Sequence, residues 1–277
     1  MFRTLNMVLG CDEPLDRLHR AIALSQLLEA HLGVTIVARA PIPPTSSYAH
    51  AAADLWAGET RSGQQAAIGR AEEVEQTLAA AGVSGDVDPH CVVPMMVDDL
   101  VAQRARYADI TLIDPDAPGW EAEQRAALDG ALFHSGRPVL LRPDPKTPFA
   151  HAERVVLAWN ATTEVNRAVA AAIGILQGAA EVHAVLVDPV PAEDGHGPEP
   201  GHGIASYLAR HDIKVSVDPV PSGGRRVAEV LSARAREIGA DLIVMGGYGH
   251  ARLRERIFGG VTQEIIEGAT VQTLMAH

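Results

Sequence analysis

Residues 241–262 read DLIVMGGYGHARLRERIFGGVT, and this stretch decides how the C-terminal half of the chain is interpreted. Its first residues, 241–245, have the apolar composition of a buried strand. Glycines 246, 247 and 249 follow, and after nine further residues the pair Gly259–Gly260 opens a helical pattern. A glycine allows the main chain to approach a ligand closely, and a helix N-terminus presents free N–H groups to anions. The stretch predicts an anion site, most naturally for a phosphate chain; the alternative is a turn that only packs tightly.

Outward from this stretch, the chain repeats one plan of alternating strands and helices. ARYADITLID (105–114) and AREIGADLIVMG (235–246) both run from a helix end through Ala-Asp into a buried strand. Such alternation predicts right-handed crossovers and parallel sheets, hence two tandem doubly wound, Rossmann-like α/β domains. Strands are expected at 3–10, 34–38, 86–93, 110–114, 136–143, 154–160, 182–187, 214–220, 241–245 and 269–277, with helices at 15–32, 66–81, 96–107, 165–176, 203–211 and 225–238.

The domain boundary is expected in the proline-rich segment 142–152, RPDPKTPFAHA, where the periodicity stops. This gives domains at 1–146 and 147–277. A length of 277 residues suits two domains, and 47% hydrophobic but only 4% aromatic residues indicate aliphatic cores.

Composition also restricts the class of partner. The 23 basic and 35 acidic residues give a net charge of −12, which argues against general binding to nucleic acid or to an anionic membrane. There is no charged-then-apolar leader and no apolar span of transmembrane length. Cys11 and Cys91 lie in apolar, strand-like contexts, which favours buried, reduced thiols. Because thiols stay reduced in the cytoplasm, a cytoplasmic location is expected.

The glycine spacing resembles the nucleotide loop of the universal stress protein family, G-x-x-G, nine residues, then G-[S/T]. Here the loop reads Gly246-x-x-Gly249, nine residues, Gly259-Gly260, so Gly260 stands where the family has a hydroxyl residue. Thr262 matches another hydroxyl position. The resemblance covers nearly the whole chain and is strongest in 154–277. It implies a mostly parallel, five-stranded sheet in each domain and ATP, with or without Mg²⁺, as the ligand.

Ligands of open α/β sheets bind at the carboxyl ends of the strands. Asn160 ends the first strand of the second half, where the family commonly has an aspartate that faces the nucleoside; its amide still donates and accepts hydrogen bonds. Trp159 beside it fits somewhat better as a core aromatic residue under a helix, and Arg252 fits equally well as part of a solvated turn. The residues expected to contact the nucleotide are Ala158, Trp159, Asn160, Leu186, Met245, Gly246, Gly249, His250, Arg252, Gly259, Gly260, Val261 and Thr262.

The first half keeps an aspartate after its first strand, Asp12, but has no glycine loop. After its fourth strand come Asp114, Pro115 and Asp116, where phosphate-facing glycines are expected. Proline removes an N–H donor and carboxylates repel phosphate. The first domain is therefore interpreted as a degenerate copy; a metal ion at the two aspartates is a weaker alternative.

No catalytic constellation is evident in the sequence. Ser222-Gly223-Gly224 is interpreted as a plain turn, because the pyrophosphatase loop that it partly matches belongs after a first strand. His196, Glu199 and His202 are interpreted as parts of a surface loop and not as metal ligands.

Two functions from different classes remain open. The first is a stress-response protein, not an enzyme beyond slow ATP hydrolysis, that binds an adenine nucleotide in its second domain as a regulatory ligand. The second is a structural or interaction module of the same fold without a nucleotide; adenylyl transfer is disfavoured because the first-strand motif is missing. The closing strand, 270–276, is expected to pair between domains of one chain or in a homodimer.

Overall fold

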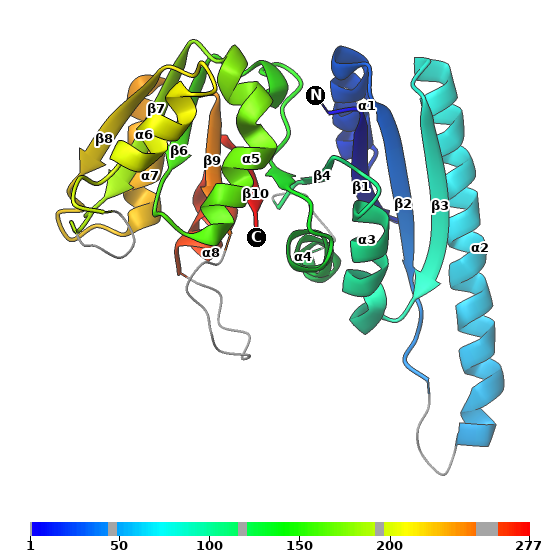
Figure 1. The fold of residues 1–277 in the computed structure, drawn as a ribbon. Helices are drawn as coiled ribbons and strands as arrows, with labels where there is room; N and C mark the ends of the chain where they lie inside the picture. Colours follow the sequence, from blue (N-terminus) through cyan, green and yellow to red (C-terminus); the bar gives the residue numbers. More distant parts are fainter. Residues whose placement is uncertain (1, 44–48, 116–120, 192–196, 248–259) are drawn as a thin grey trace. The chain divides into compact units, whose positions relative to one another are not determined.

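The computed structural model describes residues 2–43, 49–115, 121–191, 197–247 and 260–277 (Figure 1). Its contacts divide the chain into two compact units, residues 2–137 and 138–277. Each unit is an α/β domain with a mainly parallel sheet, so the predicted fold class is confirmed.

The N-terminal unit has the strand order β3-β2-β1-β4, with β1–β2, β2–β3 and β1–β4 all paired in parallel. The side chains of β3 alternate between two helices: one face of the strand turns toward α2 and the other toward α3. Its elements are β1 (Thr4–Gly10), α1 (Asp16–Leu28), β2 (His31–Arg39), α2 (Ala49–Ala81), β3 (Gly85–Val92), a 3-10 turn (Pro94–Met96), α3 (Val97–Ala105), β4 (Ile110–Ile113), α4 (Glu121–Asp129) and a π-helical turn (Gly130–His134).

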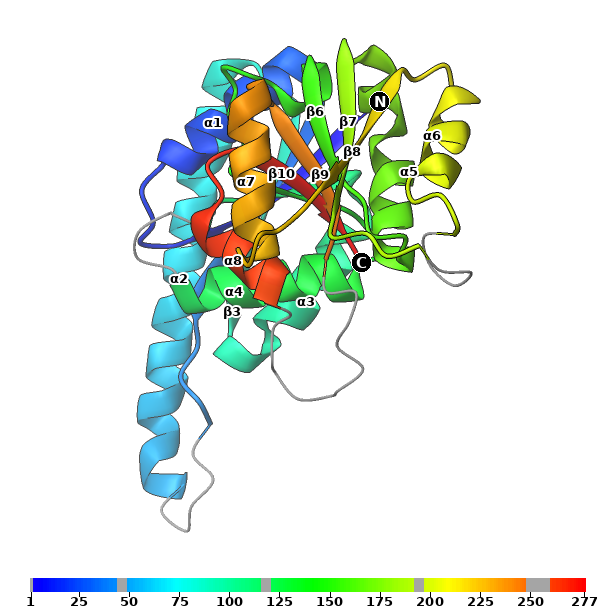
Figure 2. The same ribbon diagram turned by 90° about the vertical axis from the view of Figure 1, so that its left-hand side faces the viewer.

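The C-terminal unit has the strand order β8-β7-β6-β9-β10-β5. Helices α5 and α6 lie on one face of its sheet and α7 and α8 on the other (Figure 2). Its elements are β5 (Val139–Leu141), a 3-10 turn (Phe149–His151), β6 (Arg154–Ala158), α5 (Thr163–Gly178), β7 (Glu181–Val187), α6 (His202–Ala209), β8 (Val215–Val220), α7 (Val227–Ile238), β9 (Leu242–Gly246), α8 (Gly260–Gly268) and β10 (Gln272–Ala276).

The distribution of strands differs from the five expected in each domain. Among the described residues the N-terminal unit has four strands and the C-terminal unit six, because β5 pairs antiparallel with β10. The C-terminal unit consequently begins at Pro138, whereas the sequence placed the boundary after residue 146. A three-residue apolar strand carries no signal for its partner, so this pairing was not predictable from the sequence.

Helix α2 is much longer than the helix expected at 66–81, since it begins at Ala49. Its first part extends past the sheet (Figure 1). Buried residues with helical spacing start only at Ala67 and continue with Ala71, Val74 and Leu78. The apolar period that reveals an amphipathic helix was therefore present only where α2 buries apolar side chains.

In both units, an aspartate carboxylate accepts hydrogen bonds from the main chain at the start of the central strand. The Asp109 carboxylate, directly before β4, accepts hydrogen bonds from the first two N–H groups at the start of β1, at 2.7 and 3.0 Å. The Asp241 carboxylate, before β9, accepts from the corresponding groups at the start of β6, at 2.9 and 3.0 Å. These aspartates are the Ala-Asp residues that the sequence comparison of the halves singled out.

The outermost strand of the C-terminal unit, β8, has an aspartate held by an arginine of α7. Asp218 Oδ2 accepts hydrogen bonds from Arg234 Nη2 at 2.7 Å and from Nε at 3.2 Å, and lies 3.0 Å from His183 Nδ1. Val220 O faces β7, where it accepts from the N–H of Asp188, so Pro219 faces the free edge of the sheet. A proline there removes an outward N–H donor and discourages pairing with another chain. The N-terminal unit repeats the arrangement with Asp88, Pro89 and Arg104.

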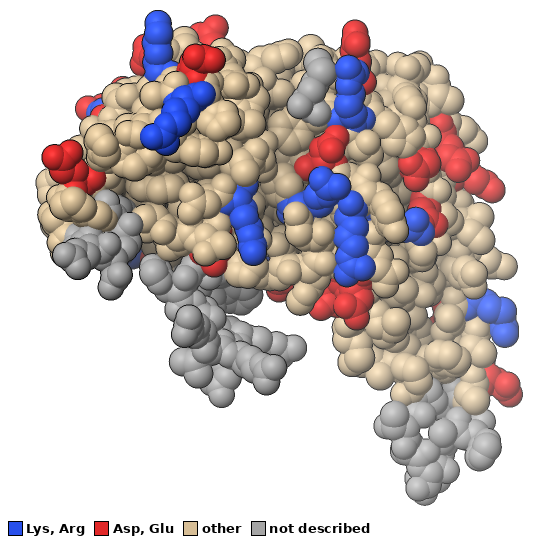
Figure 3. All heavy atoms as spheres, in the orientation of Figure 1, with Lys and Arg blue, Asp and Glu red and all other residues tan. Residues whose placement is uncertain are grey.

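None of the helices in the described segments combines the length and apolar character needed to cross a membrane. In the same segments, no three His, Cys, Asp or Glu side chains are grouped so that they could hold a metal ion. On the face drawn in Figure 3, acidic and basic side chains are interspersed over the described residues.

The Asp218 contact predicts a specific pH dependence of stability. Burial raises the pKa of Asp218, but hydrogen bonds from Arg234 and His183 and their charges together lower it below the ordinary aspartate value. A carboxyl with a lowered pKa in the folded state stabilises the fold above its unfolded pKa and loses this contribution as the pH falls through its folded pKa. We expect the midpoint of thermal unfolding to fall more steeply between about pH 5 and about pH 3 in the wild type than in Asp218→Asn. Parallel curves for the two proteins would contradict the assignment.

Candidate functional site

Four strands of the C-terminal unit end side by side. Ala158, the last residue of β6, is in register with Val185 of β7 and with Met245 of β9. Gly246 at the end of β9 is in register with Ala276 of β10. The structure therefore places the residues that the sequence selected from β6, β7 and β9 along one edge, which we call the C-terminal carboxyl edge.

The side chains at this edge differ in accessibility. Leu186 and Met245 are buried in the core, so their side chains form the base of the edge and not its surface. Ala158 and Trp159 are half-buried and Asn160 is exposed. Trp159 therefore contributes to the surface as well as to packing.

Asn160 and Thr162 form a polar turn between β6 and α5. Asn160 Oδ1 accepts hydrogen bonds from Thr162 Oγ1 at 3.0 Å and from Thr162 N–H at 3.4 Å. Thr162 is the N-cap of α5, and its Oγ1 accepts from the N–H of Val165 at 3.5 Å. The Asn160 amide thus organises a helix start with an uncharged group, where an aspartate would add a negative charge.

Gly246 has a packing role that the sequence did not reveal. A β-carbon at this position would lie 2.6 Å from the main-chain nitrogen of Val165 and 2.9 Å from Cβ of Glu164. Real β-carbons do not approach other atoms so closely. The first glycine of the motif is therefore required where β9 crosses the first turn of α5, whatever else it does.

Gly260 is in the opposite situation. It is exposed at the first residue of α8, and within the part of the chain that the structure describes no neighbouring atom lies within 4 Å of where its β-carbon would be. Thr262 in the same turn is buried, and Val261 between them is half-buried. The predicted helix start at this glycine is present. Gly249, His250, Arg252 and Gly259 lie outside the described residues.

Three polar residues at the edge were missed in the sequence: Thr162, Glu164 and His277. His277 Nδ1 is 3.0 Å from the main-chain oxygen of Gly247. Burial raises the pKa of Glu164, but hydrogen bonds from its own N–H and from Thr162, with the charges of His277 and Arg167, lower it below the ordinary glutamate value. The threonine followed by an acidic residue in a first helical turn was the signal available; His277 had none.

The corresponding edge of the N-terminal unit is built differently. Gly10, the last residue of β1, donates its N–H to Glu13 Oε2 at 3.1 Å, and Glu13 Oε1 pairs with Arg17 Nη1 at 2.5 Å. Arg20, one turn further along α1, pairs with Asp114 after β4. By strand register Gly10 corresponds to Asn160 of the C-terminal unit, and Asp12 lies two residues beyond it. Carboxylates thus occupy this edge, as the interpretation of a degenerate copy expects, and Asp116 lies outside the described residues.

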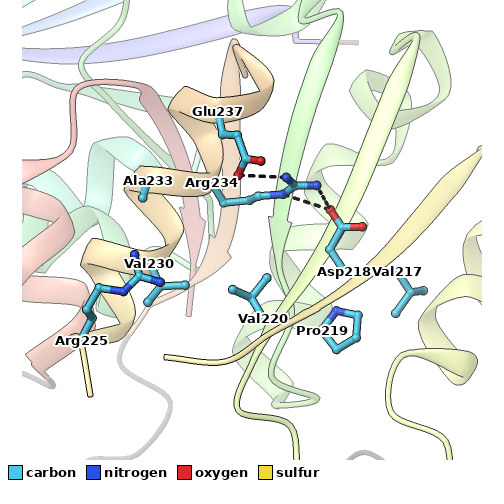
Figure 4. A pocket seen from close by; sticks show the side chains of 9 residues that line it. All are labelled: Val217, Asp218, Pro219, Val220, Arg225, Val230, Ala233, Arg234 and Glu237. Carbon is cyan, nitrogen blue, oxygen red and sulfur yellow. Dashed lines mark hydrogen bonds and ion pairs between the residues drawn. The ribbon is translucent and has the colours of Figure 1, made fainter. Parts of the chain in front are cut away.

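A separate hollow of about 450 Å³ lies between β8 and α7 (Figure 4). The ion pairs of Arg234 with Asp218 and Glu237 form one part of its wall, and Arg225 lies apart from them near Val230. Of the predicted nucleotide contacts that the structure describes, none lines this hollow.

Comparison with known proteins agrees with this architecture. Residues 151–277 match the model of the universal stress protein family. A universal stress protein from Archaeoglobus fulgidus DSM 4304 has 18% identity and a TM-score of 0.67, covering 98% of this chain and 97% of its own. A putative universal stress protein from Pseudomonas aeruginosa UCBPP-PA14 has 13% identity and a TM-score of 0.55, covering 99% and 92%. A functionally unknown protein from Pseudomonas aeruginosa PAO1 has 14% identity, the same TM-score and the same coverage. No match was found among curated protein sequences.

The three structural likenesses concern the fold. The family match covers residues 151–277, which lie within the C-terminal unit.

The two glycines at this edge give a matched pair of stability tests. Gly246→Ala places a β-carbon against the main chain of α5, and we expect a loss of about 1–3 kcal/mol, typical of overpacking. Gly260→Ala enters open space, and we expect a change within about 0.5 kcal/mol, as at other surface positions. Chemical unfolding of both variants measures the difference. Equal losses would contradict the packing role of Gly246.

Proposed function

We propose that the C-terminal domain binds an adenine nucleotide, ATP in the first instance, at the C-terminal carboxyl edge. The observation that carries the proposal is the space around Gly260 at the start of α8, which the described residues leave open, in the same domain as the aligned ends of β6, β7 and β9. Open α/β sheets bind ligands at their carboxyl edge, and a helix start there offers N–H donors to phosphate. The sequence adds Gly249, His250, Arg252 and Gly259 to the proposed site.

The nucleoside would be held by polar groups without a formal charge. Asn160 is exposed and carries both a donor and an acceptor, which suits a ribose hydroxyl or a base edge. Ala158 and half-buried Trp159 supply apolar surface beside it. The departure from aspartate to Asn160 removes a charge and retains hydrogen-bonding capacity.

The negative charge of Glu164 affects how a phosphate chain can bind at this edge. Glu164 lies in the first turn of α5, with its main chain and Cβ against Gly246, and the lowered pKa of its carboxyl keeps it negatively charged at neutral pH. A polyphosphate at this edge therefore needs a counter-charge, which Mg²⁺ bound to the nucleotide would supply. A carboxylate with a lowered pKa is also a weak general base. We accordingly propose a regulatory ligand with little or slow hydrolysis, in a cytoplasmic stress-response protein.

A second function has one observation in its favour. Gly246 is needed for the packing of β9 on α5. This part of the glycine motif would therefore be retained even if the protein bound no nucleotide. The alternative is a structural or interaction module of the same fold. In either case the edge of β10 is paired with β5 of the same chain, and a homodimer would use another surface.

Titration calorimetry of the full chain with ATP and Mg²⁺ distinguishes the two functions. We expect the wild type to bind and Gly260→Asp, which puts a carboxylate where phosphate is proposed, to bind at least about tenfold more weakly, a difference of about 1.4 kcal/mol. Gly260→Ala is the steric control and should retain binding. Absence of a binding heat in the wild type would favour the module without a nucleotide. Equal affinity of the wild type and the aspartate variant would contradict the placement of the phosphate at Gly260.

A further inference from the structure

The turn that follows β1 in the N-terminal unit is closed by reciprocal hydrogen bonds. The N–H of Glu13 donates to the main-chain oxygen of Gly10 at 3.3 Å, and the N–H of Gly10 donates to Glu13 Oε2 at 3.1 Å. Arg70 of α2 also donates to the main-chain oxygen of Glu13. The Glu13 carboxylate is therefore fixed directly over the last N–H of the central strand.

The second carboxylate oxygen is bound by a buried cation. Glu13 Oε1 lies 2.5 Å from Arg17 Nη1, and the two side chains are only 3% and 7% exposed. Removing either partner would leave an uncompensated charge inside the protein, which is strongly destabilising. One main-chain N–H and one guanidinium thus bind the two oxygens of a buried carboxylate. Main-chain N–H groups and guanidinium groups are donors with which proteins bind oxyanions.

The turn that contains Glu13 lies where open α/β sheets bind their ligands. Strand β1 lies between β2 and β4, and the chain leaves it toward β2 before returning to β4 on its other side, so the order reverses at β1. Beside it, the Arg20–Asp114 pair places a further carboxylate at the end of β4. Ligands of open α/β sheets bind at such a switch point.

We propose that the N-terminal unit retains an oxyanion site at this edge and that the protein's own Glu13 carboxylate occupies it. The site takes small oxyanions, of which the glutamate carboxylate is the intramolecular example. Because Glu13 is tethered three residues from Gly10, its effective concentration exceeds that of any free anion. The edge is closed to external anionic ligands as long as Glu13 is present. This inference does not depend on nucleotide binding by the C-terminal domain.

Chemical rescue tests the proposal in the full chain. In Glu13→Ala the Gly10 N–H and Arg17 lose their acceptor, so the midpoint of thermal unfolding should fall. Sodium formate supplies a free carboxylate, and at about 0.1 M it should raise this midpoint by at least about 2 °C more than sodium chloride of equal ionic strength. The wild type, whose site is filled, should respond equally to the two salts. As a second probe, the midpoint of thermal unfolding is compared in inorganic phosphate and in chloride of equal ionic strength.

The matched control is Glu73→Ala, which removes an exposed carboxylate from its pair with Arg70. This variant should show no preference for formate over chloride. If Glu13→Ala does not fold in chloride, refolding in formate should restore the folded chain. Equal behaviour of Glu13→Ala in formate and in chloride, folded or not, overturns the proposal, as does an equal formate effect in Glu73→Ala.

Discussion

The structure depends on how the last main-chain groups of the central parallel strand are satisfied in each domain. Parallel strands bring their carboxyl ends to one edge, where N–H groups and helix starts converge and attract negative charge. In the N-terminal domain a buried carboxylate from the same chain, Glu13, receives the N–H of Gly10. In the C-terminal domain, among the described residues, no carboxylate accepts a hydrogen bond from the end of β6, and the neutral Asn160 organises the turn.

This difference appears on a shared scaffold. Both domains have the strand order of a doubly wound sheet, both start their central strand on an aspartate carboxylate, and both hold their outermost strand with an Asp–Arg pair beside an outward-facing proline. Contacts that build the sheet are thus the same in the two halves, whereas those at the carboxyl edge differ. This distribution is expected when the two halves share a fold but only one of them leaves its carboxyl edge open to an external ligand.

Much of the fold followed from the sequence because apolar strand runs and the Ala-Asp signal at Asp109 and Asp241 mark the central strands directly. The pairing of β5 with β10 did not follow, since a short apolar strand does not specify its neighbour. The first half of α2 was missed because its described side chains are only exposed or half-buried, so it shows no apolar period. At the site, the motif singled out Gly246 and Gly260, but only the folded structure reveals that α5 encloses Gly246 and that the described residues leave space around Gly260. The pairing of Glu13 with Arg17 has a helical spacing that is visible in the sequence, yet its burial is a tertiary property.

Of the two carboxyl edges, only that of the C-terminal domain is proposed to accept an external nucleotide. Native mass spectrometry of the full chain with ATP and Mg²⁺ counts bound nucleotides per chain and therefore separates the two edges. We expect saturation at one nucleotide per chain. Saturation at two would show that the edge closed by Glu13 also binds, and a chain that binds none at any concentration would leave both edges without the proposed ligand.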